Sequence, residues 1–126
     1  MEQVDMVNHP PHYAVTPEGV SRECIEFTRN MPFSQGNAFK YVYRLGNKAN
    51  SMEDLNKALF YLDDALVNGP IVNLGDGQTS HIDPCTDRTA VLRDIATGEL
   101  DYAYTMLMLI KTTNGFEYLD RRYDTA

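Results

Sequence analysis

The feature that most constrains the fold is an apolar stripe at helical spacing in residues 51–68. Its members recur every three or four residues and therefore share one side of a helix; they are Leu55, Ala58, Leu59, Leu62, Ala65 and Leu66. The sequence Asn68-Gly69-Pro70 then ends the pattern. Most of the stability of such a helix comes from packing its apolar side, so neighbouring segments have to cover it.

Four further stretches show the same periodicity, at about 20–31, 34–45, 86–97 and 99–113. Pro32 stops the first of them and Gly98 the third. Ser34 is a candidate N-cap for the second, and either Asp83 or Thr86 for the third. The sequence therefore predicts an all-α fold, a compact bundle of four or five helices.

The chain divides by pattern into four segments. Residues 1–19 carry four of the prolines and glycines and no helical period, which predicts an extended N-terminal arm. Residues 20–68 hold three predicted helices, 69–84 a long Gly- and Pro-rich loop, and 85–126 the C-terminal helices. At 126 residues these segments are expected to form a single domain over 1–126. A loop of that length in a small domain is usually functional or disordered.

Composition excludes several classes of function. The net charge of −7 argues against binding of duplex nucleic acid, which needs a basic footprint. No apolar run approaches the roughly 18 residues of a membrane span, and the N-terminus lacks a signal-peptide layout. We therefore expect a cytoplasmic protein with no membrane partner. Two cysteines, Cys24 and Cys85, are too few for a disulfide scaffold and lack metal-binding spacing, so no metal site is predicted.

The second predicted helix carries an unusual group of polar side chains. Asn37, Lys40, Tyr41, Arg44 and Lys48 fall at i, i+3, i+4, i+7 and i+11, which places them on one face. Arginine and lysine bind phosphate oxygens, and an aromatic ring can stack on a base or a sugar. The pattern favours a site for a small phosphorylated ligand. The alternative is a solvated face whose charge is absorbed by carboxylates of the next helix.

The arm carries two histidines within the string NHPPHY. Pro10 and Pro11 favour polyproline II, with about three residues per turn, so His9 and His12 project from the same side. One interpretation is a stiff arm that packs Tyr13 onto the body of the protein. The other is a pair of imidazoles that faces a site.

Acidic pairs suggest a different chemistry. Glu23 and Glu26 stand one turn apart on the first predicted helix, and Glu53 and Asp54 open the third. Nucleotide pyrophosphohydrolases of the MazG type hold magnesium with two such pairs. The second pair departs from their pattern, because Asn56 and Lys57 stand where the fourth carboxylate belongs. A MazG-like hydrolase is kept as an alternative function.

Four strings, in this order and at these spacings, resemble one family. They are VNHPPHY (7–13), ECIEF (23–27), GNAFKYVYRLGNK (36–48) and EDLNKALFYLDDAL (53–66). The family comprises short, mostly phage-encoded proteins of unknown function (DUF3310-like), often labelled nucleotide kinase after a coliphage member that phosphorylates deoxynucleoside monophosphates. The resemblance covers about residues 7–66. It adds two residues, Asn8 and Lys57, to those singled out above.

The resemblance implies a (deoxy)nucleoside monophosphate kinase that uses a nucleoside triphosphate, with Mg²⁺ as the candidate cofactor, in the host cytoplasm. In that hypothesis the catalytic residues are His9, His12 and Arg44. Substrate contacts are expected from seven further residues: Asn8, Tyr13, Asn37, Lys40, Tyr41, Lys48 and Lys57.

Two other kinds of function remain open. The first is a protein that binds or sequesters a nucleotide without chemistry, which needs the cations but no general base. The second is a homo-oligomer built on the apolar C-terminal helix, whose candidate interface residues are Tyr102, Tyr104, Met106 and Met108. Such an interface is compatible with either nucleotide hypothesis.

Overall fold

The structure is a computed structural model that describes residue 17 and residues 19–46 and 51–119. Within these residues the prediction of an all-α fold is confirmed, and the strand-like pairing there is one isolated bridge between Val20 and Ile82. The helical elements are α2 (Cys24–Thr28), α3 (Phe33–Arg44), α4 (Ser51–Asn68), α5 (Asp76–Thr79), α6 (Asp87–Ala96), α7 (Leu100–Thr113) and the 3-10 helix η1 (Gly115–Tyr118).

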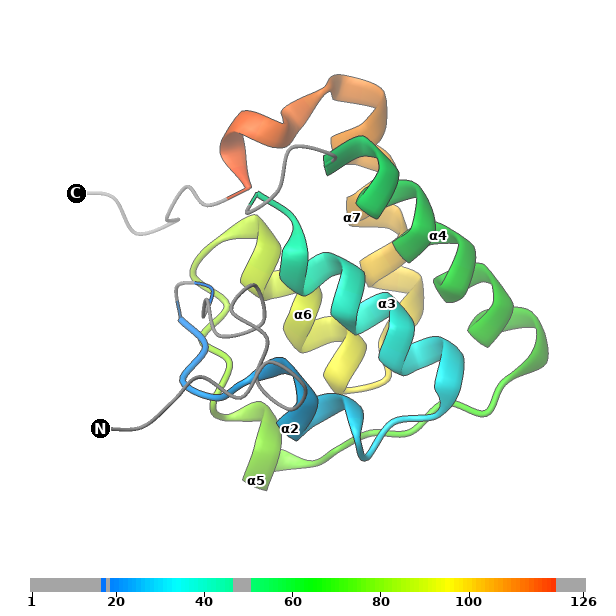
Figure 1. The fold of residues 1–126 in the computed structure, drawn as a ribbon, viewed down its shortest axis with the longest axis vertical. Coiled ribbons are helices and arrows are strands. Elements are labelled where there is room, and N and C mark those ends of the chain that lie inside the picture. The colour runs from blue at the N-terminus through cyan, green and yellow to red at the C-terminus, as the bar shows by residue number, and fades with distance from the viewer. Residues whose placement is uncertain (1–16, 18, 47–50, 120–126) are drawn as a thin grey trace, which may run out of the picture.

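Four helices form the body of the protein (Figure 1). Helix α3 packs against α4 and α6, and α7 packs against the same two helices from the other side. The short α2 lies against α3. The predicted stripe of α4 faces this bundle, because Leu55, Ala58 and Leu62 are fully buried. Leu66 lies at the edge of the stripe and is 37% exposed.

Helix α7 is covered mainly by the chain's own helices. Its inward positions Leu100, Ala103 and Leu107 are buried, as predicted. Tyr104, Met106 and Met108 of the expected subunit interface are half-buried against the core. Tyr102, the fourth residue of that expected interface, is 67% exposed, and Leu109 is 56% exposed, so α7 keeps two large apolar side chains at the surface. No helix in the described parts of the chain is long and apolar enough to cross a membrane.

Helix α2 is shorter than the predicted 20–31, because both ends of that stretch are used otherwise. Val20 pairs with Ile82 instead of continuing the helix. Gly19, at φ +87°, allows this pairing: a Cβ there would lie 2.6 Å from the carbonyl oxygen of Asp83. After Thr28 the chain turns into α3.

The predicted N-cap role of Ser34 is wrong, whereas that of Thr86 is confirmed. Pro32 occupies the N-cap of α3, so Ser34 lies in its first turn and donates a hydrogen bond to Asp64 of α4. This bond and one from Asn68 lower the pKa of Asp64. Thr86 accepts a hydrogen bond from the backbone N–H of Thr89 at the start of α6.

A buried glutamine fixes the long loop to the bundle. Gln35 is 0% exposed, and its amide nitrogen donates to the carbonyl oxygens of Val72 and Ile95, each at 2.7 Å. Its side-chain oxygen accepts from the N–H of Val72 at 2.9 Å. Close by, the N–H of Leu74 donates to the carbonyl of Ala96 at 2.9 Å. One side chain of α3 thus joins the 69–84 loop to the end of α6.

Replacement of Gln35 by leucine is expected to lower the free energy of unfolding by about 2–4 kcal/mol. The N–H and the carbonyl oxygen of Val72 would lose this partner, whereas the carbonyl oxygen of Ile95 keeps the hydrogen bond from the N–H of Gly98. Each unsatisfied buried group costs about 1–3 kcal/mol. Urea denaturation followed by circular dichroism measures the change. The control is Gln78→Leu, because the hydrogen bond that the Gln78 side chain accepts from Asn30 is exposed. Equal losses in the two variants would contradict the role given to Gln35.

Candidate functional site

Five predicted site residues lie outside the described residues: Asn8, His9, His12, Tyr13 and Lys48. Their roles stay predictions. The other predicted residues lie on α3 and α4, the two helices that run side by side in Figure 1.

Three cationic side chains converge on the ring of Tyr41. The Lys40 ammonium lies 4.6 Å from the ring centroid, the Lys57 ammonium 5.4 Å, and the guanidinium carbon of Arg44 5.8 Å. A cation within about 6 Å of an aromatic face is attracted by the ring quadrupole. The structure thus brings together four of the predicted residues, which we call the Tyr41 cluster: Lys40, Tyr41, Arg44 and Lys57.

Asn37 lies one turn before the cluster and does not join it. Its amide nitrogen donates to the carbonyl oxygen of Phe33 at 2.8 Å. One N–H of this amide is therefore engaged by its own helix.

The cations of the cluster differ in their carboxylate partners. Arg44 Nε lies 3.9 Å from Asp54 Oδ2, and Lys57 Nζ lies 3.5 Å from Glu53 Oε2. The Lys57 pair is exposed, and pairs of this kind contribute about 0–1 kcal/mol and exchange readily with solvent. For Lys40, no carboxylate partner is found among residues 19–46 and 51–119. Among the carboxylates of these residues, then, none compensates the charge of Lys40, in contrast to Arg44 and Lys57.

The ion pair of Arg44 is largely buried. The side chains of Arg44 and Asp54 are 18% and 5% exposed, and neither Arg44 Nε nor Asp54 Oδ2 makes a hydrogen bond. The sequence allowed a second interpretation of this polar face, in which carboxylates of the next helix compensate its charge. For Arg44 that interpretation applies, because Asp54 compensates it. A ligand reaching Arg44 would have to share the guanidinium with Asp54.

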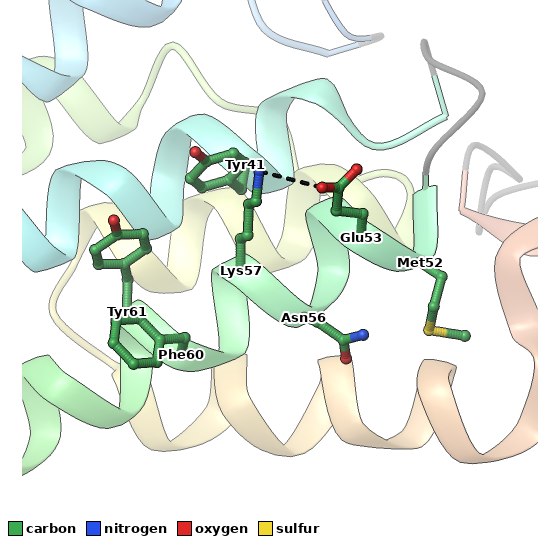
Figure 2. Close-up of a pocket in the computed structure, with 7 residues that line it drawn as sticks. All are labelled: Tyr41, Met52, Glu53, Asn56, Lys57, Phe60 and Tyr61. Carbon is green, nitrogen blue, oxygen red and sulfur yellow. Dashed lines mark ion pairs between the residues drawn. The ribbon is translucent and has the colours of Figure 1, made fainter.

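A hollow of about 530 Å³ adjoins the cluster. Figure 2 shows Lys57 and Glu53 extending from α4 toward Tyr41 of α3, while Met52 and Asn56 project from the opposite side of α4. The rings of Tyr41 and Tyr61 are parallel within 5° at 6.0 Å, and Phe60 meets Tyr61 edge-on at 5.2 Å. The full lining is Tyr41, Met52, Glu53, Asn56, Lys57, Phe60 and Tyr61.

Sequence patterns alone did not assign Met52, Asn56, Phe60 or Tyr61 to the site. A signal was present, because Met52, Asn56 and Phe60 recur every four residues on the side of α4 away from the apolar stripe. Tyr61 lies one turn after Lys57, so it shares the face of that lysine.

The acidic pairs expected for a MazG-like site have other partners. Glu23 and Glu26 form a reciprocal capping box at the start of α2, and Glu26 also pairs with Arg22 at 3.6 Å. Glu53 and Asp54 hold Lys57 and Arg44. In the described parts of the chain, no three histidine, cysteine or acidic side chains gather as a metal site would require. These contacts give the hydrolase alternative no support.

Cys24 lies in the core between α2 and α3 and is not a nucleophile candidate. Burial raises the pKa of its thiol to about 12, although nearby Lys40 acts in the opposite direction. The thiol therefore stays protonated at neutral pH.

Comparison with known proteins finds a family match for the segment that carries the Tyr41 cluster. Residues 7–63 match the model of a family described as protein of unknown function (DUF3310). The resemblance of this segment to the DUF3310 family is thus confirmed. The DUF3310 match includes all four residues of the Tyr41 cluster and every residue that lines the hollow. Searches of curated proteins and of solved structures gave no match.

Replacement of Arg44 by methionine is expected to destabilise the fold by about 2–4 kcal/mol. Breaking a buried ion pair by removal of one partner leaves the other charge uncompensated, in this case Asp54. The double variant Arg44→Met, Asp54→Asn should recover part of the loss in chemical denaturation. As a control, Lys57→Met breaks an exposed pair and should cost less than about 1 kcal/mol. Additive losses in the double variant would show that the two side chains are not coupled.

Proposed function

We propose that the protein binds a nucleotide, with its phosphate at the Tyr41 cluster and its nucleoside in the adjoining hollow. The observation that supports this most is the convergence of three cationic side chains on one ring, in a chain of net charge −7, beside a hollow of about 530 Å³. Ligand sites commonly measure about 300–1,000 Å³. The DUF3310 match names no activity, so this proposal rests on the site.

The three cations would have different roles in binding the phosphate. Lys40 is the strongest phosphate candidate because no described carboxylate competes for it. Lys57 can leave its exposed pair with Glu53 at little cost. Arg44 is held by Asp54 and would mainly supply a fixed positive field. Because Asp54 and Glu53 compensate Arg44 and Lys57, the charge that a bound anion would compensate is mainly that of Lys40.

Tyr41 has a different role in this proposal from the expected contact with base or sugar. Its ring is already approached by the three cations and by Tyr61. In this proposal the ring of Tyr41 holds the three cations together by cation–π attraction. Contact with the nucleoside then falls to the other residues of the hollow, chiefly the ring of Tyr61 and the amide of Asn56, which can both donate to and accept from a base edge.

The finer proposal is a deoxynucleoside monophosphate kinase, as the family resemblance implies. Such an enzyme would transfer a phosphoryl group from a nucleoside triphosphate, with Mg²⁺ as candidate cofactor, in the cytoplasm of a phage-infected host. Positioning and charge stabilisation dominate phosphoryl transfer, and a cation cluster suits that chemistry. A sequestering protein would use the same cluster without His9 and His12.

Replacement of Lys40 by methionine should weaken nucleotide binding about 10- to 100-fold. Methionine keeps the apolar stem, and a lost hydrogen bond to a charged group costs about 1.5–3 kcal/mol. A thermal-shift screen of nucleoside mono-, di- and triphosphates, with and without Mg²⁺, followed by calorimetry of the best ligand, measures the change. The control is Lys111→Met in the last turn of α7. If no nucleotide stabilises the unaltered protein, the proposed function is wrong.

Replacement of His9 and His12 by alanine separates the kinase from the sequestering protein. In a kinase the double variant should lose phosphoryl transfer to a deoxynucleoside monophosphate, by about 10²-fold or more, and keep its affinity for nucleotide. Product formation is followed by chromatography and affinity by calorimetry. Binding without any turnover in the unaltered protein would favour sequestration.

A further inference from the structure

Three aromatic rings form a row across the seam between α3 and α4. The ring of Tyr41 lies 6.0 Å from that of Tyr61 and is parallel to it within 5°. Tyr61 in turn lies 5.9 Å from the ring of Phe33, which meets it edge-on at 77°. Figure 2 shows the two tyrosine rings, one from each helix. We call Phe33, Tyr61 and Tyr41 the aromatic row, and its Tyr41 end is the centre of the Tyr41 cluster.

The Phe33 end of the row lies outside the hollow. Tyr41 and Tyr61 line the hollow, whereas Phe33 does not. Phe33 is nevertheless 74% exposed, the most exposed of the large apolar side chains that the structure describes. A nucleoside that fills the hollow would leave this ring uncovered. A single exposed apolar side chain is ordinary, but an exposed ring in line with a cationic site is the arrangement on which bases stack.

We propose that the site binds the 5′-phosphorylated end of a single-stranded nucleic acid, with its first base at Tyr61 and its second base on Phe33. The terminal phosphate lies at the Tyr41 cluster, and the strand continues from the 3′ oxygen of the first nucleotide. The first nucleotide lies where the proposed function puts it, so this assignment rests on that proposal. Stacking on aromatic rings tolerates any base, because every base has a π-face.

The spacing of the rings favours a single strand over a duplex. Neighbouring centroids of the row are 6.0 and 5.9 Å apart. In a duplex, successive nucleotides of one strand rise by about 3.4 Å, and their bases stay stacked on one another. Two bases that each face one ring of this row have to be separated from each other. An extended single strand meets that requirement.

The charges at the two ends of the row orient the strand. The ammonium groups of Lys40 and Lys57 lie 4.6 and 5.4 Å from the Tyr41 ring. At the other end, the carboxylate of Asp64 accepts a hydrogen bond from Ser34, the neighbour of Phe33. This bond lowers the pKa of Asp64, so its carboxylate is ionised at neutral pH. The terminal phosphate, with a charge of about −1.5 to −2, therefore belongs at the Tyr41 end.

The acidity of the chain limits how much of a strand can be held. The net charge is −7, which repels a long polyanion. Of the three cations at the Tyr41 end, Arg44 is paired with Asp54 and Lys57 with Glu53. Phosphate binding is therefore confined to this end of the row, and the Phe33 end contributes stacking alone. This arrangement suits the end of a strand and not its middle.

Calorimetry with short oligonucleotides tests the second base. The probes are the four 5′-phosphorylated deoxydinucleotides with two identical bases, each compared with the deoxynucleoside monophosphate of the same base. The dinucleotides that bind should do so at least about fivefold more tightly than their monophosphates, because one stacked base contributes that much or more. A dinucleotide with an abasic second sugar should bind like the monophosphate. A blunt DNA hairpin with the same 5′-phosphate should bind no more tightly than the monophosphate.

Replacement of Phe33 by alanine should remove the advantage of the second base. Affinity for the dinucleotide should fall at least about fivefold, whereas affinity for the monophosphate should not change, because Phe33 does not line the hollow. The matched control is Tyr102→Ala, which removes a ring of α7 that is 67% exposed. It should change neither affinity. Circular dichroism checks that both variants keep the fold.

The outcomes distinguish this assignment from the proposed function. If the monophosphate binds but the dinucleotide binds no more tightly, the second base has no site and the proposed function stands. An equal loss of both affinities in Phe33→Ala, or a hairpin that binds as tightly as the dinucleotide, would also overturn the assignment. If no monophosphate and no dinucleotide binds, the proposed function fails together with it.

Discussion

The buried amide of Gln35 is the contact on which the arrangement of the other elements depends. It satisfies three backbone groups that belong to the 69–84 loop and to the end of α6. Buried backbone groups without partners are costly, so the loop can cross the base of the bundle only because α3 offers this side chain. With α6 fixed against one side of α3, α4 occupies the other, and α7 completes the bundle by packing on both. The opposite face of α3 is then left to carry Lys40, Tyr41 and Arg44.

The sequence predicts the parts of this fold that depend on local periodicity and capping. The buried side of α4, the cap at Thr86 and the helix Leu100–Thr113 all follow from residue spacing. The sequence does not predict the features that are decided by tertiary contacts. Val20 has the right spacing for a helix, yet Ile82 recruits it into a bridge. Nothing in the sequence distinguishes Gln35 from an exposed glutamine, because its partners lie 37 and 60 residues away.

The candidate site, too, is predicted from the sequence only in part. Helical spacing predicts that Lys40, Tyr41 and Arg44 share a face, and the family motif adds Lys57 from the next helix. Spacing cannot predict the relative register of α3 and α4, and that register decides which cation meets which carboxylate. In the observed register Arg44 pairs with Asp54, and Lys40 has no described acidic partner. Arg44, which was expected to act on the substrate, is therefore the cation that the protein holds most firmly. The distinction between a structural and a binding cation is thus a property of the packing.

Acidic residues on α4 separate the two surfaces of this helix. On the side that faces α3, Glu53 and Asp54 each hold a cation near Tyr41, which allows three positive side chains to gather in an acidic protein without strong repulsion. On the solvent side, Asp63 stands between Phe60 and Val67 and interrupts what would otherwise be an uncharged apolar row. A carboxylate within this row keeps the exposed apolar surface from being continuous, and large continuous apolar patches favour aggregation. The charges of α4 therefore act differently on its two sides: they compensate cations near Tyr41, and they limit the apolar surface that faces solvent.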